Sequence, residues 1–245
     1  MIYVMSDING EYEKYIRMLK KIHLKDEDSL FILGNVIDIG ANGIKVLQDM
    51  MMRPNVYPIL GNHEYMALKS LPALVENLTE SSIADLDKEV LAELNAWILE
   101  GGNTTIQAFT KLDEDEKQDI IDYLEEFVPY EEIEAGGREF VLVNAGLDNF
   151  DANKDLDNYK LSEFIYNAPN YFKQYYSDKI LVTGHTPTRV IYAEEQGVSI
   201  SDIQDKLDEF DKVYFANNHL AINCEAAGDG KLACVCLDTM KVFYV

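Results

Sequence analysis

The chain is poor in positive charge and in long apolar runs. Its 245 residues include 21 Lys or Arg against 44 Asp or Glu, which gives a formal net charge of −23. Such a charge repels polyphosphate backbones, so we expect no general nucleic-acid binding. No apolar run approaches the roughly 20 residues that span a bilayer, and residues 1–10 turn polar too early for a signal peptide. We therefore expect a soluble acidic protein that does not insert into a membrane.

Cysteine is also scarce, with Cys224, Cys234 and Cys236 the only three. An odd number of thiols cannot all pair, and we expect the three to lie together on one predicted hairpin. Buried, reduced thiols explain them better than a metal site, and they favour a cytoplasmic protein.

Short apolar runs separated by helical patterns organise the chain. Residues 2–5, 29–33 and 55–60 are strand candidates, and the patterns at 11–21 and 43–52 are helical. This alternation predicts parallel βαβ units in an α/β protein, with polar loops at the strand ends where ligands bind.

The second half of the chain predicts a helical insertion and more strands. The pattern of residues 66–134 predicts an acidic helical cap, interrupted at Gly101–Gly102. We expect this cap to be an insertion within a single domain that spans 1–245. Strands are expected at 139–143 and 179–183, and an amphipathic helix at 201–210. The C-terminal residues predict antiparallel strands with turns at 228–230 and 238–241.

Five polar loops follow these strands in order. They are SDINGEY (6–12), GNVIDIG (34–40), GNHE (61–64), NAGLD (144–148) and GHTPT (184–188). This series resembles the GDxHG, GDxxDRG, GNHE, HAG and GH motifs of PPP-type, calcineurin-like metallophosphoesterases, which include Ser/Thr protein phosphatases and symmetrical diadenosine tetraphosphatases. The resemblance implies a β-sandwich flanked by helices, two divalent metals (Mn, Fe, Zn or Mg), and phosphoproteins or dinucleoside polyphosphates as substrates.

The resemblance also implies a set of metal-binding positions. The first metal would take the positions of Asp7 and Asn9, and the residue that bridges both metals would be Asn35. The second metal would take three positions, namely Asn62, Asn144 and His185. Asn9 and Asn144 stand where the family has histidine, and Asn35 stands where it has aspartate.

The catalytic and phosphate-binding positions follow in the same way. By resemblance, His63 would protonate the leaving group, and Asp38 would hold it. Ile39 and Ala168 occupy the positions of the two arginines that bind phosphate in the family. Neither side chain can form the bidentate contacts that make arginine a strong phosphate ligand. The two remaining histidines, His23 and His219, are expected to be structural or surface residues.

Electrostatic repulsion between metal ions decides whether we expect an active or an inactive phosphoesterase. Two dications about 3.5 Å apart repel by roughly 20 kcal/mol at an effective dielectric near 20, and a neutral Asn35 cannot offset that. We therefore predict a catalytically inactive or severely impaired protein that holds no metal or one weakly bound ion. The alternative is an active phosphatase with a mononuclear site on Asp7, Asn62 and His185.

Overall fold

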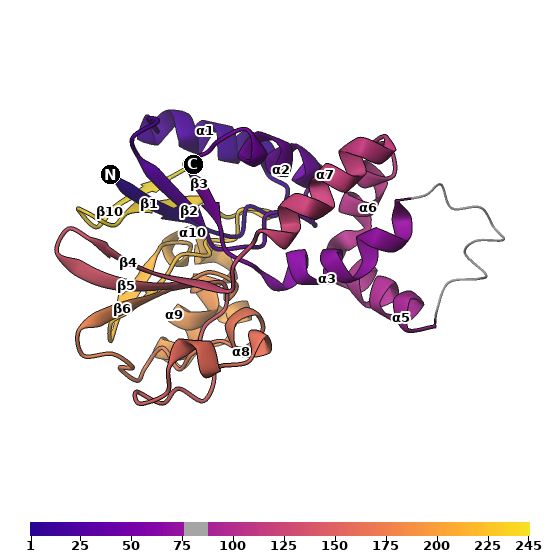
Figure 1. The fold of residues 1–245 in the computed structure, drawn as a ribbon. Coiled ribbons are helices and arrows are strands. Elements are labelled where there is room, and N and C mark those ends of the chain that lie inside the picture. Colours follow the sequence, from indigo (N-terminus) through magenta and orange to yellow (C-terminus); the bar gives the residue numbers. More distant parts are fainter. Residues whose placement is uncertain (76–87) are drawn as a thin grey trace.

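Two mixed β-sheets form the centre of the protein, as the computed structural model shows for residues 1–75 and 88–245 (Figure 1). The first sheet has the order β10-β9-β1-β2-β3 and the second β4-β5-β6-β8-β7. Their strands are β1 (Ile2–Met5), β2 (Ser29–Ile32), β3 (Val56–Pro58), β4 (Tyr130–Ala135), β5 (Arg138–Val143), β6 (Lys179–Thr183), β7 (Tyr214–Ala216), β8 (His219–Ala221), β9 (Ala233–Cys236) and β10 (Lys241–Tyr244).

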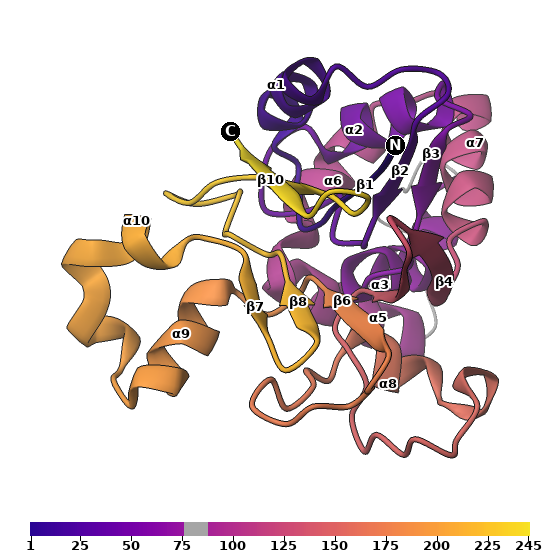
Figure 2. The ribbon, with the colours of Figure 1, turned by 90° about the vertical axis from the view of Figure 1, so that its left-hand side faces the viewer.

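The helices lie outside the two sheets, so the predicted β-sandwich flanked by helices is confirmed (Figures 1 and 2). The α-helices are α1 (Tyr12–Ile22), α2 (Gly43–Met51), α3 (Asn62–Ser70), α5 (Lys88–Trp97), α6 (Asn103–Phe109), α7 (Glu114–Glu125), α8 (Leu161–Ile165), α9 (Thr188–Gln196) and α10 (Leu207–Phe210). The structure also contains 3₁₀ helices at Leu71–Leu74, Leu156–Asn158 and Ile200–Lys206. A π-helical turn lies at Ile98–Gly102.

The parallel βαβ arrangement predicted for the N-terminal part is also confirmed. Strand β1 pairs in parallel with β2, and β2 with β3. Helix α1 forms because its apolar residues recur every three or four positions, which buries one stripe, and it ends at His23 in a left-handed conformation. The carboxyl ends of β1, β2 and β3 consequently meet at one edge of the sheet.

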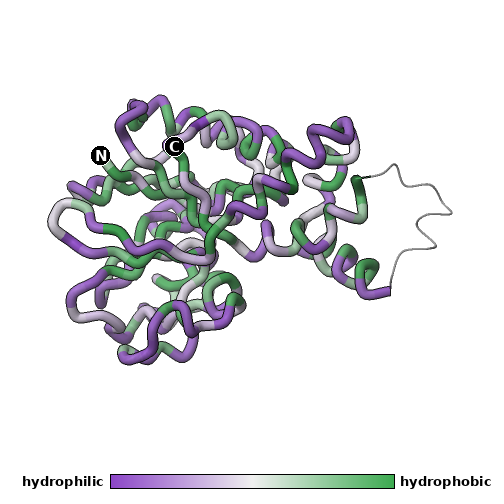
Figure 3. Tube along the Cα trace, in the orientation of Figure 1, coloured by the Kyte–Doolittle hydropathy of each residue, from purple (hydrophilic) through white to green (hydrophobic). Residues whose placement is uncertain are grey.

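The core between the sheets is continuous. One apolar cluster joins strands of both sheets, including Val4, Phe31, Phe140, Val182 and Val235. Hydrophobic residues are frequent along the central strands, and hydrophilic and hydrophobic residues alternate along the helices (Figure 3). A second cluster lies on the far face of the first sheet and includes side chains of α2, α5, α6 and α7.

The insertion predicted at 66–134 has different limits in the structure. Helix α3 begins before it, at Asn62, and the helical region ends with α7 at Glu125. Residues 130–134, predicted to be helical, belong to the edge strand β4. Pairing of β4 with β5 across the turn at 136–137 overrides the acidic composition of this segment. Part of the predicted helix, residues 76–87, lies outside the described residues.

Two C-terminal predictions need correction. Residues 201–210 form a 3₁₀ segment followed by the short α10, because Ile200 and Ile203 share a face at the three-residue spacing of a 3₁₀ helix. The turn at 228–230 does not close a hairpin, since β8 lies in the second sheet and β9 in the first. Cys224 therefore lies on a crossing loop, while Cys234 and Cys236 share the β9–β10 hairpin. All three are free, buried thiols.

Candidate functional site

The five polar loops converge at the carboxyl ends of the strands, and backbone hydrogen bonds tie them together. The first loop bonds to the second through Asp7 N–H to Gly34 O (3.1 Å) and Asn9 N–H to Asn35 O (2.8 Å). In the second sheet, Gly184 N–H donates to Asn144 O over 2.7 Å. The structure therefore brings the predicted metal positions of both sheets into one loop cluster.

These loops contain an unusual number of left-handed residues. Six of the predicted site residues that are not glycine have positive φ: Asp7, Asn9, Asn35, Asp38, Ile39 and His185. Asn and Asp tolerate this region, but a β-branched residue such as Ile39, at φ 58°, is strained there. Strain concentrated in strand-end loops is typical of sites that have a function.

Asp7 is the only buried carboxylate among the predicted metal positions. Its Oδ1 accepts a hydrogen bond from Asn35 Nδ2 (3.0 Å), and its Oδ2 accepts one from the backbone of His185 (2.9 Å). Burial raises the pKa of Asp7 to about 6, although hydrogen bonds from Ser6, His185 and Asn35 oppose the rise. Asp7 is therefore mainly ionised at neutral pH.

Asn35 is held by Glu64, the last residue of the GNHE loop. Glu64 is fully buried and accepts hydrogen bonds from the backbone of Asn35 (2.8 Å), Val36 (2.8 Å), Ile37 (3.3 Å) and Gly61 (3.2 Å). Burial raises the pKa of Glu64, and these donors oppose it. Glu64 thus fixes the backbone of the second loop at Asn35.

Three amide oxygens in the cluster lack a hydrogen-bond donor among the described residues. They are Oδ1 of Asn9, Asn35 and Asn144, and all three residues are more than nine-tenths buried. The other end of Asn144 donates from Nδ2 to Leu33 O over 2.7 Å, which links the second sheet to the first. The site consequently presents neutral amide groups where, by resemblance, the family has imidazoles and a second carboxylate.

Asn62 and His185, the two positions of the second metal that keep the residue type of the family pattern, bond to each other. His185 Nδ1 donates to Asn62 Oδ1 over 3.1 Å, which occupies the oxygen that a metal would use. Burial and the nearby charge of His63 lower the pKa of His185, so this imidazole is neutral at physiological pH.

His63 and Asp38 form the pair that the sequence predicts. His63 Nδ1 donates to Asp38 Oδ2 over 2.7 Å. Burial lowers the pKa of His63, but the hydrogen bond and charge of Asp38 outweigh it, and the net pKa is raised. Asp38 also accepts from Trp97 Nε1 (2.6 Å) and Thr105 Oγ1 (2.5 Å), both from the helical insertion. The insertion is thus part of the support for this pair.

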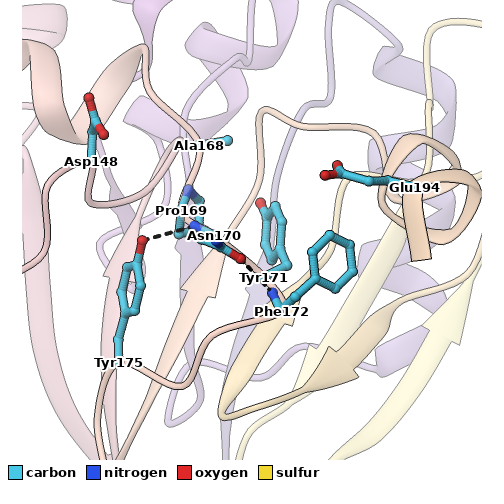
Figure 4. Close-up of a pocket in the computed structure, with 8 residues that line it drawn as sticks. All are labelled: Asp148, Ala168, Pro169, Asn170, Tyr171, Phe172, Tyr175 and Glu194. Atoms are coloured by element: carbon cyan, nitrogen blue, oxygen red, sulfur yellow. Dashed lines mark hydrogen bonds between the residues drawn. The ribbon is translucent and has the colours of Figure 1, made fainter. Parts of the chain in front are cut away.

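The two predicted phosphate positions offer no positive charge. The Ile39 side chain is 49% exposed. Ala168 lies on the rim of a depression of about 300 Å³, which Figure 4 shows with its eight lining residues. Asp148 and Glu194 contribute carboxylates to this lining, and none of the eight is Lys or Arg. A phosphate group would meet negative charge at this place.

Three residues that support the site were not predicted from the sequence, namely Glu64, Trp97 and Thr105. Glu64 could have been recognised as a carboxylate three positions after Gly61, where it accepts a hydrogen bond from the N-cap backbone at the start of α3. Trp97 and Thr105 lie about sixty residues after Asp38 in sequence, so no local pattern announces their contact with it.

Comparison with known proteins identifies the family. The profile of the calcineurin-like phosphoesterase family matches residues 1–216. The chain therefore belongs to the calcineurin-like phosphoesterases.

Curated relatives and solved structures agree with this assignment. A symmetrical bis(5'-nucleosyl)-tetraphosphatase from Buchnera aphidicola is 29% identical over 47% of this chain and 41% of the relative. One from Nitrosococcus oceani is 26% identical over 40% and 36%. The matched segment thus spans less than half the length of these relatives. The fold is similar to that of a protein serine/threonine phosphatase from Saccharomyces cerevisiae, with a TM-score of 0.53, 11% identity and coverage of 96% and 72%.

The residues present do not fit the pair of divalent metals that the family uses. A dinuclear site needs a bridging anion, and Asn35 instead turns an N–H group toward Asp7. Within residues 1–75 and 88–245, no group of three or more His, Cys, Asp and Glu side chains is placed to hold a metal ion. In the same described part, no helix is long and apolar enough to cross a membrane.

Proposed function

We propose that this chain is a calcineurin-like phosphoesterase that has lost dinuclear hydrolysis and acts by binding. The observation that carries the proposal is the hydrogen bond from Asn35 Nδ2 to Asp7 Oδ1, at the position where the family has a bridging carboxylate. Ile39 and Ala168 support it, since both lack the charge that would hold a phosphate. The free thiols support a cytoplasmic location.

The acidic helical insertion is the proposed binding element. Helix α7 starts with three consecutive acidic residues, Glu114, Asp115 and Glu116. Together with the net charge of −23, this surface favours a basic protein partner over a nucleic acid.

Turnover assays test the loss of hydrolysis. With Mn²⁺ present, we expect no metal-dependent rate on p-nitrophenyl phosphate, a phosphopeptide or diadenosine tetraphosphate. Asn9→His, Asn35→Asp and Asn144→His together should restore metal binding, and full turnover should need Ile39→Arg as well. A clear Mn²⁺-dependent rate of the unaltered chain would refute the proposal.

One observation favours a second candidate function, a phosphatase with a single metal ion. The donor-free amide oxygens of Asn9, Asn35 and Asn144 lie in the same loop cluster as the Asp7 carboxylate, and all of these are hard oxygen ligands. Such oxygens suit Mg²⁺ or Ca²⁺ better than transition metals. The names of the relatives suggest dinucleoside polyphosphates as its substrates. Turnover that depends on Mg²⁺ at a stoichiometry of one would support this candidate.

A further inference from the structure

A single buried carboxylate joins three loops in this protein. Asp7 follows β1, accepts from Asn35 in the loop after β2, and accepts from His185 in the loop after β6. The loops after β1 and β2 belong to the first sheet and the loop after β6 to the second, so the contact with His185 crosses the sandwich. A buried charge is tolerated only when it is paired or well hydrogen-bonded, and here neutral hydrogen-bond donors perform that task.

The backbone that carries the Asn35 amide is held in place by the chain itself. Its backbone N–H is fixed by Glu64 Oε2 at 2.8 Å, and its left-handed φ of 52° is one that Asn accepts readily. Only the amide form offers Asp7 a hydrogen atom at this place. An aspartate here would instead put a second carboxylate about 3 Å from the first.

Asn144 makes a neutral link across the sandwich. Its side chain is fully buried, and Nδ2 donates to Leu33 O, the last carbonyl before the second loop. Gly34 leaves room for it, because a Cβ there would lie 2.9 Å from Asn144 Nδ2. The Asn35 and Asn144 links are both made by side-chain amides at positions that hold metal ligands by resemblance.

We infer that Asn35 and Asn144 replace divalent ions as the structural link of this loop cluster, so that the protein folds and stays assembled without metal. Asn35 supplies a hydrogen-bond donor to Asp7, and Asn144 joins the two sheets. The inference rests on the proposed loss of the dinuclear centre, and it adds a consequence for folding that catalytic measurements do not address.

Thermal unfolding of the full chain with and without metal tests the inference. Ligands that bind only the folded state raise its Tm. We expect the Tm of the unaltered protein to agree within about 1 °C in EDTA and in millimolar MnCl₂, MgCl₂ or CaCl₂. A rise of several degrees with any of these ions would overturn the inference.

Charge exchange between the two side chains provides the second test. In EDTA near pH 8, Asn35→Asp should lower the Tm by about 5 °C or more, because two carboxylates then face each other. Asp7→Asn combined with Asn35→Asp should recover most of that loss, since one carboxylate again faces one amide. The matched control Asn170→Asp adds a charge at an exposed residue whose Oδ1 is an acceptor, and its Tm should change little.

The outcomes separate this inference from the proposed function. If Asn35→Asp is as stable as the unaltered protein in EDTA, or if the double variant shows no recovery, the inference is wrong. Mn²⁺ should raise the Tm of Asn35→Asp more than that of the unaltered chain, and equal responses would contradict the inference. Turnover of the unaltered chain would refute the proposed function without bearing on these comparisons.

Discussion

Single residues carry the main differences between this chain and the pattern of its family. Asn35 is the clearest, because one amide in place of a carboxylate removes the charge that would hold two cations together. Ile39 combines two effects, since it lacks a phosphate-binding group and occupies a left-handed conformation.

Replacement of Ile39 should relieve backbone strain. We expect Ile39→Asn to raise the free energy of unfolding by about 1 kcal/mol, because Asn tolerates φ near 58° and the side chain is half-exposed. Urea denaturation measures the change. As a control, Leu99→Asn at an exposed residue with helical dihedral angles should bring no gain. A loss of stability at residue 39 would show that its apolar contacts outweigh the strain.

His219 should make stability depend on pH. Burial lowers the pKa of His219, whose Nε2 donates to Lys173 O over 2.8 Å. Below about pH 6.5, the imidazole of His219 therefore takes up a proton in the unfolded chain but not in the folded chain. The contribution of His219 to the free energy of unfolding is accordingly present above that pH and falls on acidification. The loss is at most about 1.4 kcal/mol per pH unit.

Denaturation between about pH 5 and pH 8 isolates this contribution. His219→Gln should flatten the acid side of the stability profile relative to the unaltered protein, whereas His23→Gln at an exposed position should not. Identical profiles for the unaltered protein and His219→Gln would contradict the assignment.

At the scale of elements, the helical insertion and the loop cluster depend on each other. Trp97 at the end of α5 and Thr105 in α6 both donate to Asp38. The bend at the π turn brings them there, with Gly101 at φ 100°. A Cβ on Gly102 would lie 2.5 Å from Trp97 Nε1, which explains the glycine at that position.

Loss of the indole donor should therefore destabilise the protein. Trp97→Phe keeps an aromatic ring but removes one hydrogen bond to a buried carboxylate, and we expect a loss of about 2–3 kcal/mol. Urea denaturation measures this loss. Unfolding should be followed by far-UV circular dichroism, because Trp97 is the only tryptophan and the variant has no tryptophan fluorescence. A loss below about 0.5 kcal/mol would mean that the insertion does not support Asp38.

The sequence predicted the elements around the site better than those away from it. Strands before polar loops were recognisable because apolar runs ended at Gly, Asn or Asp, as at Ser29–Ile32. Strand β4 was missed because its sequence, YEEIEA, is half acidic, and pairing with β5 decides its conformation. The contacts of Asp38 with the insertion depend on tertiary structure, and only the His63 partner followed from resemblance.

At the scale of the whole molecule, the fold and the loop order are those of the family, while the chemistry of the loops is altered. The two sheets, the flanking helices and the converging loops remain. The loop cluster is held by amide, carboxylate and backbone hydrogen bonds that are local to this chain. Under the proposed loss of hydrolysis, the scaffold is retained without the activity, since glycines and apolar runs specify the fold and a few ligand residues specify the activity.

Metal stoichiometry tests the central claim most directly. The unaltered protein should be incubated with Mn²⁺, freed of loose ions by gel filtration and measured by elemental analysis. The account predicts fewer than one tightly held ion per chain, because Asn35 provides no anion to bridge two cations. Two equivalents of tightly held manganese in each chain would contradict it.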